Sequence, residues 1–209
     1  MTMEGEKLPE KVILMYDAVI GMLEDGIDLN RMKVIDITKR AGIGKGTAYE
    51  YVSSKEELIV GALLYDIQKQ FERIIGAITA IDGFQPKVER ILDWILDNFR
   101  ECKTFALFAR IGMGTYDISE HLKNEMRKAR AKECCVTSIL EQVVDEIMEC
   151  GVKEGILKPA KKELQRMAFG SQILIFSMYL ADLEHRKQSE LSMEEVKRFT
   201  YESIVKALN

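Results

Sequence analysis

Histidine and proline are scarce in this sequence of 209 residues, which has two of the first and three of the second. The two histidines, His121 and His185, lie far apart in the chain, and neither stands beside a nucleophile or a metal-binding motif. A catalytic site needs several such groups converging on one point, so the sequence does not predict an enzyme. We also expect no cofactor and no bound metal.

Cysteine is present four times, but not in the spacing of a metal site or a disulfide scaffold. Cys102 and Cys150 are isolated in the sequence, and reduced thiols are expected. Cys134 and Cys135 are adjacent. Two interpretations of this pair stay open: two ordinary helix positions, or a thiol- or soft-metal-responsive sensor.

Long apolar runs are missing as well. The longest apolar stretch, residues 168–183, is interrupted by Gln172 and Asp182, and the N-terminus lacks the basic-then-apolar layout of a signal peptide. We therefore predict a cytoplasmic protein with no membrane partner. The net charge of −4 excludes a bulk polycation but leaves room for a local basic surface.

Nearly the whole chain has the apolar spacing of helices, and no segment alternates like a strand. Pro9, Pro86 and Pro159 each stand where a helix would begin. The sequence therefore predicts an all-α fold. The expected helices begin after Pro9, and then cover about 34–41, 45–51, 54–81, a stretch after Pro86 followed by a Phe-rich segment, 122–151, 164–183 and a last segment around 196–207.

The segment 164–183 is apolar on two faces, one through Met167, Ser171, Leu174 and Met178. A helix with two apolar faces needs two apolar neighbours. We expect it to pair with the last helix in a homodimer seam, although burial in one large core is the alternative. The residues predicted for the dimer interface are Phe169, Ile173, Phe176, Leu180 and Phe199.

The stretch AGIGKGTAYEYVSSKEEL, residues 41–58, suggests a phosphate loop at first. A Walker loop needs Ser or Thr directly after its lysine and a glycine five residues before it, whereas Lys45 is followed by Gly46 and preceded at that distance by Arg40. The dinucleotide fingerprint fails too, because its third glycine would fall on Thr47. Nucleotide binding is therefore not favoured.

Two short helices joined by a turn at residues 42–44 instead make a helix-turn-helix arrangement, whose second helix enters the DNA major groove. Ala41 is small enough to let the helices approach, and Ile43 is placed to fill the space between them. Ser54 and Glu57 have the spacing of a capping box, which predicts the start of a long helix.

The sequence DITKRAGIGKGTAYEYVSSKEEL resembles the DNA-binding signature of TetR-family transcriptional regulators, of the form I-A-x-x-A-G-V-S-x-G-T-x-Y-x-Y-F-x-S-K-E-x-L. The resemblance implies an N-terminal three-helix helix-turn-helix domain over residues 1–57, and a larger helical ligand-binding and dimerisation domain over 58–209. It also implies a ligand-responsive regulator of the repressor type, which binds a pseudo-palindromic double-stranded operator as a homodimer and is released by a small, largely apolar effector. The alternatives are a thiol- or metal-responsive regulator of the same fold and a helical protein-interaction adaptor.

The same resemblance assigns a DNA-facing surface. Lys55 would hold a phosphate, Lys45 suits guanine O6 or N7, and Glu50 either accepts from cytosine N4 or stays solvated. Lys33 takes the place where a threonine often begins the second helix. The residues assigned to DNA are Lys33, Lys45, Gly46, Thr47, Tyr49, Glu50, Tyr51 and Lys55.

Large apolar residues on the helices between the DNA-binding region and the expected seam are the candidates for an effector pocket. Packing in the core is the alternative for any one of them. Arg110 could pair with a carboxylate head group there. The candidates are Phe71, Trp94, Phe99, Phe105, Phe108, Met113, Tyr116 and Met126.

Overall fold

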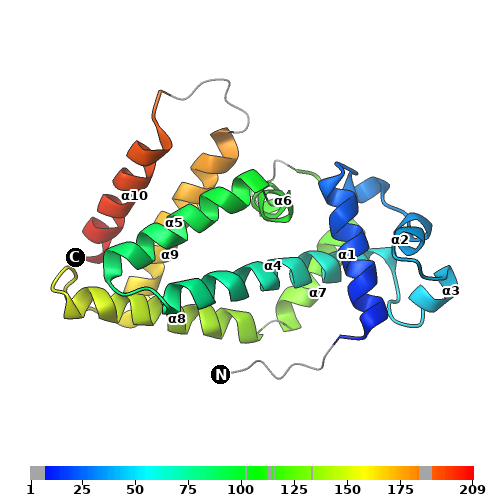
Figure 1. Cartoon of the computed structure of the whole chain (residues 1–209), viewed down its shortest axis with the longest axis horizontal. Coiled ribbons are helices and arrows are strands. Elements are labelled where there is room, and N and C mark those ends of the chain that lie inside the picture. The colour runs from blue at the N-terminus through cyan, green and yellow to red at the C-terminus, as the bar shows by residue number, and fades with distance from the viewer. Residues whose placement is uncertain (1–7, 102, 113, 115, 133, 184–189) are drawn as a thin grey trace. The chain divides into compact units, whose positions relative to one another are not determined.

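The computed structural model describes residues 8–101, 103–112, 114, 116–132, 134–183 and 190–209, and these contain helices and no strand. The all-α prediction is therefore confirmed (Figure 1). None of the described helices has both the length and the apolarity that crossing a membrane requires. The helices are α1 Glu10–Glu24, η1 Leu29–Arg31 (a 3-10 turn), α2 Val34–Arg40, α3 Lys45–Ala48, α4 Lys55–Thr79, α5 Phe84–Glu101, α6 Lys103–Gly112, α7 Glu120–Lys132, α8 Cys134–Lys153, α9 Lys162–Leu183 and α10 Met193–Leu208.

The chain forms two compact units, one of residues 1–69 and 117–133 and the other of residues 70–116 and 134–209. Helix α4 contributes its first part to the first unit and its last part to the second. The boundary predicted between residues 57 and 58 separates a DNA-binding domain from a ligand-binding domain. It is a division by function rather than by compactness, and it stays a prediction.

In the first unit, α1 packs against α2 and α3 around a small apolar core. Met15, Ile37 and Ala48 are fully buried there. Gly42, after α2, has φ +68°, a backbone conformation that a residue without Cβ adopts at no steric cost. The Ile43 N–H then donates to the Thr38 carbonyl at 2.9 Å, which closes the turn. The predicted helix-turn-helix is thus present, with α2 and α3 as its two helices.

The start of α4 is capped, though not as the sequence predicted. The Ser54 hydroxyl accepts from the Glu57 N–H at 3.0 Å, as in a capping box. The Glu57 carboxylate, however, accepts from the N–H of Ser53 at 2.6 Å rather than from Ser54. Both hydrogen bonds fix the chain between α3 and α4, and so the position of Lys55, the first residue of α4.

The second unit has its core between α5, α8, α9 and α10. Phe84, Leu92, Ile147, Phe176 and Ile204 are all fully buried in it. Helices α9 and α10 pack side by side, as the orange and red ribbons of Figure 1 show.

The C-terminal half of helix α8 is anchored at two points within this unit. The Asp145 carboxylate accepts two hydrogen bonds from the Arg166 guanidinium of α9, at 2.8 and 2.9 Å. Further toward the C-terminal end of α8, Gly151 lies so close to its neighbours that a Cβ there would stand 2.8 Å from side-chain carbons of both Leu157 and Phe84. Only a residue without a side chain fits.

The prediction of a single helix over 122–151 was wrong. The structure has two helices there, α7 and α8, which belong to different units. Glu133, the one charged position in the otherwise apolar stripe, lies between the two helices in the sequence and is outside the described residues.

Candidate nucleic-acid interface

An open groove of about 760 Å³ lies on the first unit, beside the helix-turn-helix. Its walls come from η1, α2, α3 and the start of α4. The residues that line it are Asn30, Arg31, Met32, Lys33, Val34, Ile35, Lys45, Tyr49 and Lys55.

The lining of this groove is strongly basic. It includes Arg31, Lys33, Lys45 and Lys55, and no acidic residue is among the nine that line it. The chain as a whole is acidic, with a net charge of −4, so positive charge is concentrated here. A groove of this sign attracts a polyanion and binds it more weakly as salt increases.

Each of the four cations stands at the end of a helix. Arg31 ends η1, Lys33 precedes α2 in an extended conformation, and Lys45 and Lys55 are the first residues of α3 and α4. The fold therefore gathers charges that are up to 24 positions apart in the chain. Asp28 caps the start of η1, because its carboxylate accepts from the Asn30 N–H at 2.8 Å.

Asn30 also ties the groove to the beginning of α7 in the same unit. Its side-chain amide donates to the Asp117 carbonyl at 3.2 Å, and its side-chain oxygen accepts from the Ser119 N–H at 3.3 Å. These bonds hold η1, and with it Arg31, in place.

The nearest acidic group would compete only weakly with a bound anion for Lys55. The Lys55 ammonium lies 3.7 Å from the Glu56 carboxylate, and about a third of the lysine side chain is exposed. An exposed ion pair of this kind contributes roughly 0–1 kcal/mol. The lysine therefore remains free to exchange this partner for a phosphate.

The structure brings together four of the eight residues assigned to DNA. Lys33, Lys45, Tyr49 and Lys55 line the groove, and the Tyr49 side chain is 49% exposed. The other four lie outside the lining, Gly46 and Thr47 on α3 and Glu50 and Tyr51 in the turn that follows it, and all but the half-buried Thr47 are exposed.

Sequence reasoning missed Arg31 and Ile35. Arg31 belongs to a 3-10 turn of three residues, which is too short to show a helical period. Ile35 lies off the buried face of α2 that Val34 and Ile37 form, and it is exposed to solvent. The signal in the sequence is an isoleucine outside that apolar stripe, two positions after Lys33.

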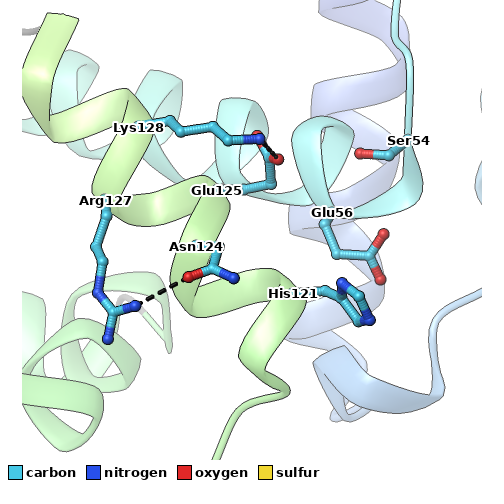
Figure 2. Close-up of a pocket in the computed structure, with 7 residues that line it drawn as sticks. All are labelled: Ser54, Glu56, His121, Asn124, Glu125, Arg127 and Lys128. Carbon is cyan, nitrogen blue, oxygen red and sulfur yellow. Dashed lines mark hydrogen bonds and ion pairs between the residues drawn. The ribbon is translucent and has the colours of Figure 1, made fainter.

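A second hollow of about 440 Å³ on the same unit lies between the start of α4 and α7. Figure 2 shows Glu56 of α4 facing His121 of α7 across it. Its charges are mixed and mostly paired: Lys128 with Glu125 at 2.6 Å, and Arg127 with the Asn124 side chain at 2.9 Å. It therefore lacks the single sign of the basic groove.

The candidate effector residues form a chain of aromatic contacts in the second unit. The ring of Trp94 lies 5.4 Å from that of Phe71 and 5.4 Å from that of Phe105, and Phe99 lies 5.3 Å from Phe105. Two of these contacts are edge-to-face, a favourable geometry for aromatic rings.

The remaining candidates are more scattered. Phe108 is half-buried, and the Arg110 guanidinium lies 5.4 Å from the centre of the Tyr116 ring. Met126 lies in the first unit, and Met113 is outside the described residues. The effector site itself stays a prediction.

The residues predicted for a dimer interface divide into two groups. Phe169, Phe176 and Leu180 are buried in the core of their own chain, so their assignment to a surface is corrected. Ile173 is half-buried, and Phe199 is 71% exposed.

The exposed apolar surface is instead the other face of α9, together with Phe199 of α10 and Leu191 just before α10. A hollow of about 370 Å³ between the two helices is lined in part by Ile175 and Phe199. The large apolar side chains exposed on α9 are Leu164, Met167, Leu174, Ile175 and Met178.

The cysteine alternative gains nothing from the described residues. The side chains of Cys134 and Cys135 lie outside them, as does Cys102. Burial and a hydrogen bond to Glu154 raise the pKa of the Cys150 thiol, which keeps it protonated and unreactive. No cluster of three or more potential ligands for a metal occurs in the part of the chain that the structure describes.

Comparison with known proteins identifies the fold. The structure is similar to that of the transcriptional regulator FadR from Bacillus subtilis in complex with stearoyl-CoA, with a TM-score of 0.65 and 15% identity over 94% of this chain and 99% of that one. FadR from Bacillus halodurans has a TM-score of 0.64 and 15% identity, over 96% and 97%. A TetR/AcrR-family regulator from Thermobifida fusca has a TM-score of 0.60 and 14% identity, over 94% and 97%.

In sequence, the chain is 28% identical over 152 residues to an uncharacterized HTH-type transcriptional regulator of Bacillus subtilis, YuxN. The match covers 72% of this chain and spans about half of that protein, 49%. No protein-family model matches the sequence. The structural neighbours are TetR-family regulators, so the resemblance seen in the helix-turn-helix sequence is confirmed at the level of the fold.

Proposed function

We propose that this chain, which has the fold of TetR-family regulators, is a ligand-responsive transcriptional repressor that binds double-stranded operator DNA as a homodimer. The observation that carries the proposal is the groove beside the helix-turn-helix, with four cations and no acidic side chain in its lining. In a chain with a net charge of −4, such a groove is the place where a polyanion would bind.

On DNA, the helix α3 would enter the major groove, as the second helix of a helix-turn-helix does. Arg31, Lys33 and Lys55 would then contact the phosphates on either side of the DNA major groove. Lys45 opens α3 and is placed to donate to guanine, while the exposed Glu50 is placed to accept from cytosine N4. Tyr49 would donate its hydroxyl to the DNA backbone.

The homodimer would form through the exposed apolar face of the second unit. Met167, Leu174 and Ile175 are each about 60% exposed or more, and Phe199 is exposed beside them on α10. Monomeric soluble proteins rarely expose such a group of large apolar side chains on neighbouring helices. Helices α9 and α10 of two copies would bury them in a four-helix bundle, and each copy would supply one half-site's recognition helix.

The effector would bind near the aromatic cluster of Phe71, Trp94, Phe99 and Phe105. The structural neighbour from Bacillus subtilis was solved with stearoyl-CoA, a ligand with a long apolar chain, and aromatic side chains favour such a guest. Arg110, close to Tyr116 in the same unit, offers a positive charge for an anionic head group. Coupling between such a site and DNA is typically on the order of 1–3 kcal/mol.

Selection of the tightest-binding sequence from a random double-stranded DNA library tests the DNA part. We expect a pseudo-palindrome that binds two chains. At physiological salt, its affinity should still be higher than that of random DNA. A chain that binds every sequence equally, or none, would contradict the proposal.

The effector part is tested separately with stearoyl-CoA as the probe. Thermal stabilisation of the chain together with release of the selected DNA is expected. Stabilisation without release would remove the switch while leaving DNA binding intact.

A further inference from the structure

Ile35 is an exposed apolar residue in the basic groove beside the helix-turn-helix. It is 51% exposed and lines the groove together with Lys33, Lys45 and Lys55. Its position on α2 follows from the geometry of the helix: Val34, Ile37 and Thr38 are buried against the first unit, and Ile35 lies about 100° around the helix from Val34. The side chain is thereby turned away from the core and toward the groove.

The fold gives no reason for an isoleucine at this position. With about half of its surface exposed, its side chain is not part of the buried core, and a β-branched residue is a poorer helix former than the Lys, Arg or Glu common at exposed positions. Its apolar surface also remains in water in the free chain. A partner that covers the groove is what would bury it.

The neighbours of Ile35 restrict the chemistry of that partner. Four cations around the groove favour a polyanion, whereas Ile35 itself has no polar atom beyond its backbone and cannot hold a phosphate. The partner must therefore present an apolar group between negative charges. The major groove of DNA does this at thymine, whose C5-methyl is the apolar group on the base edges, with phosphates on both sides.

We propose that Ile35 is a specificity-determining residue that packs on the C5-methyl of a thymine in each half-site. This assignment rests on the proposed DNA binding and adds a base contact that comes from the first helix of the motif. It differs from the contacts of Lys45 and Glu50, which would be hydrogen bonds from α3 and from the turn after it.

Replacing thymine by deoxyuridine tests the assignment, because it removes the methyl and keeps the base pair. The full chain is titrated against the selected operator, with one symmetric pair of thymines replaced at a time. Burial of one methyl-sized group corresponds to about a fourfold change in affinity, and two half-sites to about fifteenfold. We expect a loss of this size at one pair of thymines in the wild type, and none at that pair in Ile35→Ala.

Leu14→Ala is the matched control. Leu14 is an exposed apolar residue of α1 in the same unit, 43% exposed, and is not among the residues that line the groove. This variant should keep the full sensitivity to the loss of the methyl. Both positions are exposed, so both variants should fold, which circular dichroism and thermal denaturation would verify.

Two results would overturn the assignment. In the first, the affinity of the wild type does not change when deoxyuridine replaces any of the thymines. In the second, Ile35→Ala and the wild type lose the same affinity at every thymine. If Ile35 contacts a deoxyribose instead, Ile35→Ala weakens binding to every operator by the same factor. The variant and the wild type are then equally sensitive to the loss of each methyl group. A wild type without any preference for an operator would mark the failure of the proposed function itself.

Discussion

Removing one groove cation should change the salt dependence of DNA binding by an amount that the structure sets. The groove of one chain holds four cations and that of a dimer eight, so contact of every one with a phosphate gives log K against log[salt] a slope of about −7. If Lys45 contacts bases instead, the slope is about −5. Lys55→Ala removes one cation from each chain, and the slope should become shallower by about 2.

The measurement is fluorescence anisotropy with labelled operator between about 50 and 200 mM salt. Because Lys55 would hold a phosphate and no base, affinity for operator and for random DNA should fall together. The exposed pair with Glu56 contributes too little to mask this effect.

Lys161→Ala is the control with the same change in net charge. Lys161 is exposed and lies in the second unit, far in sequence from the groove residues. Its slope should equal that of the wild type. Equal slopes for Lys161→Ala and Lys55→Ala would show that net charge acts rather than the groove. An unchanged slope in a folded Lys55→Ala would remove Lys55 from the DNA surface.

Three further predictions concern stability and assembly. Gly151→Ala should lower the free energy of unfolding in urea by about 1–3 kcal/mol, because its Cβ would clash at 2.8 Å, whereas Gly76→Ala, in open space on a helix, should raise it by roughly 0.5–1 kcal/mol; equal effects would contradict the packing at Gly151. The hydrogen bonds from Arg166 lower the pKa of Asp145 to about 2, so this stabilisation is present above about pH 4 and is lost as the pH falls toward 2. Asp145→Asn should therefore cost about 1–2 kcal/mol in denaturation at pH 7 and progressively less below pH 4, and a difference that is constant with pH would refute the ion pair as its cause. Phe199→Asp should fold but sediment as a monomer at micromolar concentration, and a wild type that is itself monomeric there would contradict the dimer.

The helix-turn-helix could be predicted because its determinants are local. The glycine at position 42 provides the positive φ of the turn, and the apolar residues on either side have helical spacing. The extent of α3 could not be predicted as well. The sequence suggested a helix over 45–51, whereas the structure ends it at Ala48 and continues with turns to Tyr51, before the buried Val52.

The groove could be predicted only in part, since it is a product of tertiary structure. Lys33, Lys45 and Lys55 were assigned through the resemblance of the surrounding sequence. Arg31 joins them because Asp28 caps η1 and Asn30 binds the chain before α7, and these contacts join residues up to 89 positions apart. No periodicity in the sequence contains such information.

Helix α9 shows why a period identifies faces but not their partners. Both of its faces are apolar, and the sequence alone assigned the face with Phe169 and Phe176 to the dimer. Inside one chain, however, these rings are buried in the core that α9 shares with α5, α8 and α10, whereas Met167 and Met178 are exposed. The second apolar face is then exposed to water, whereas the exposed face of a helix in a monomer normally carries polar residues. The exposed face therefore points to assembly, and assembly doubles the number of cations that reach one DNA molecule. The salt slope and the oligomeric state thus test one arrangement through two independent measurements.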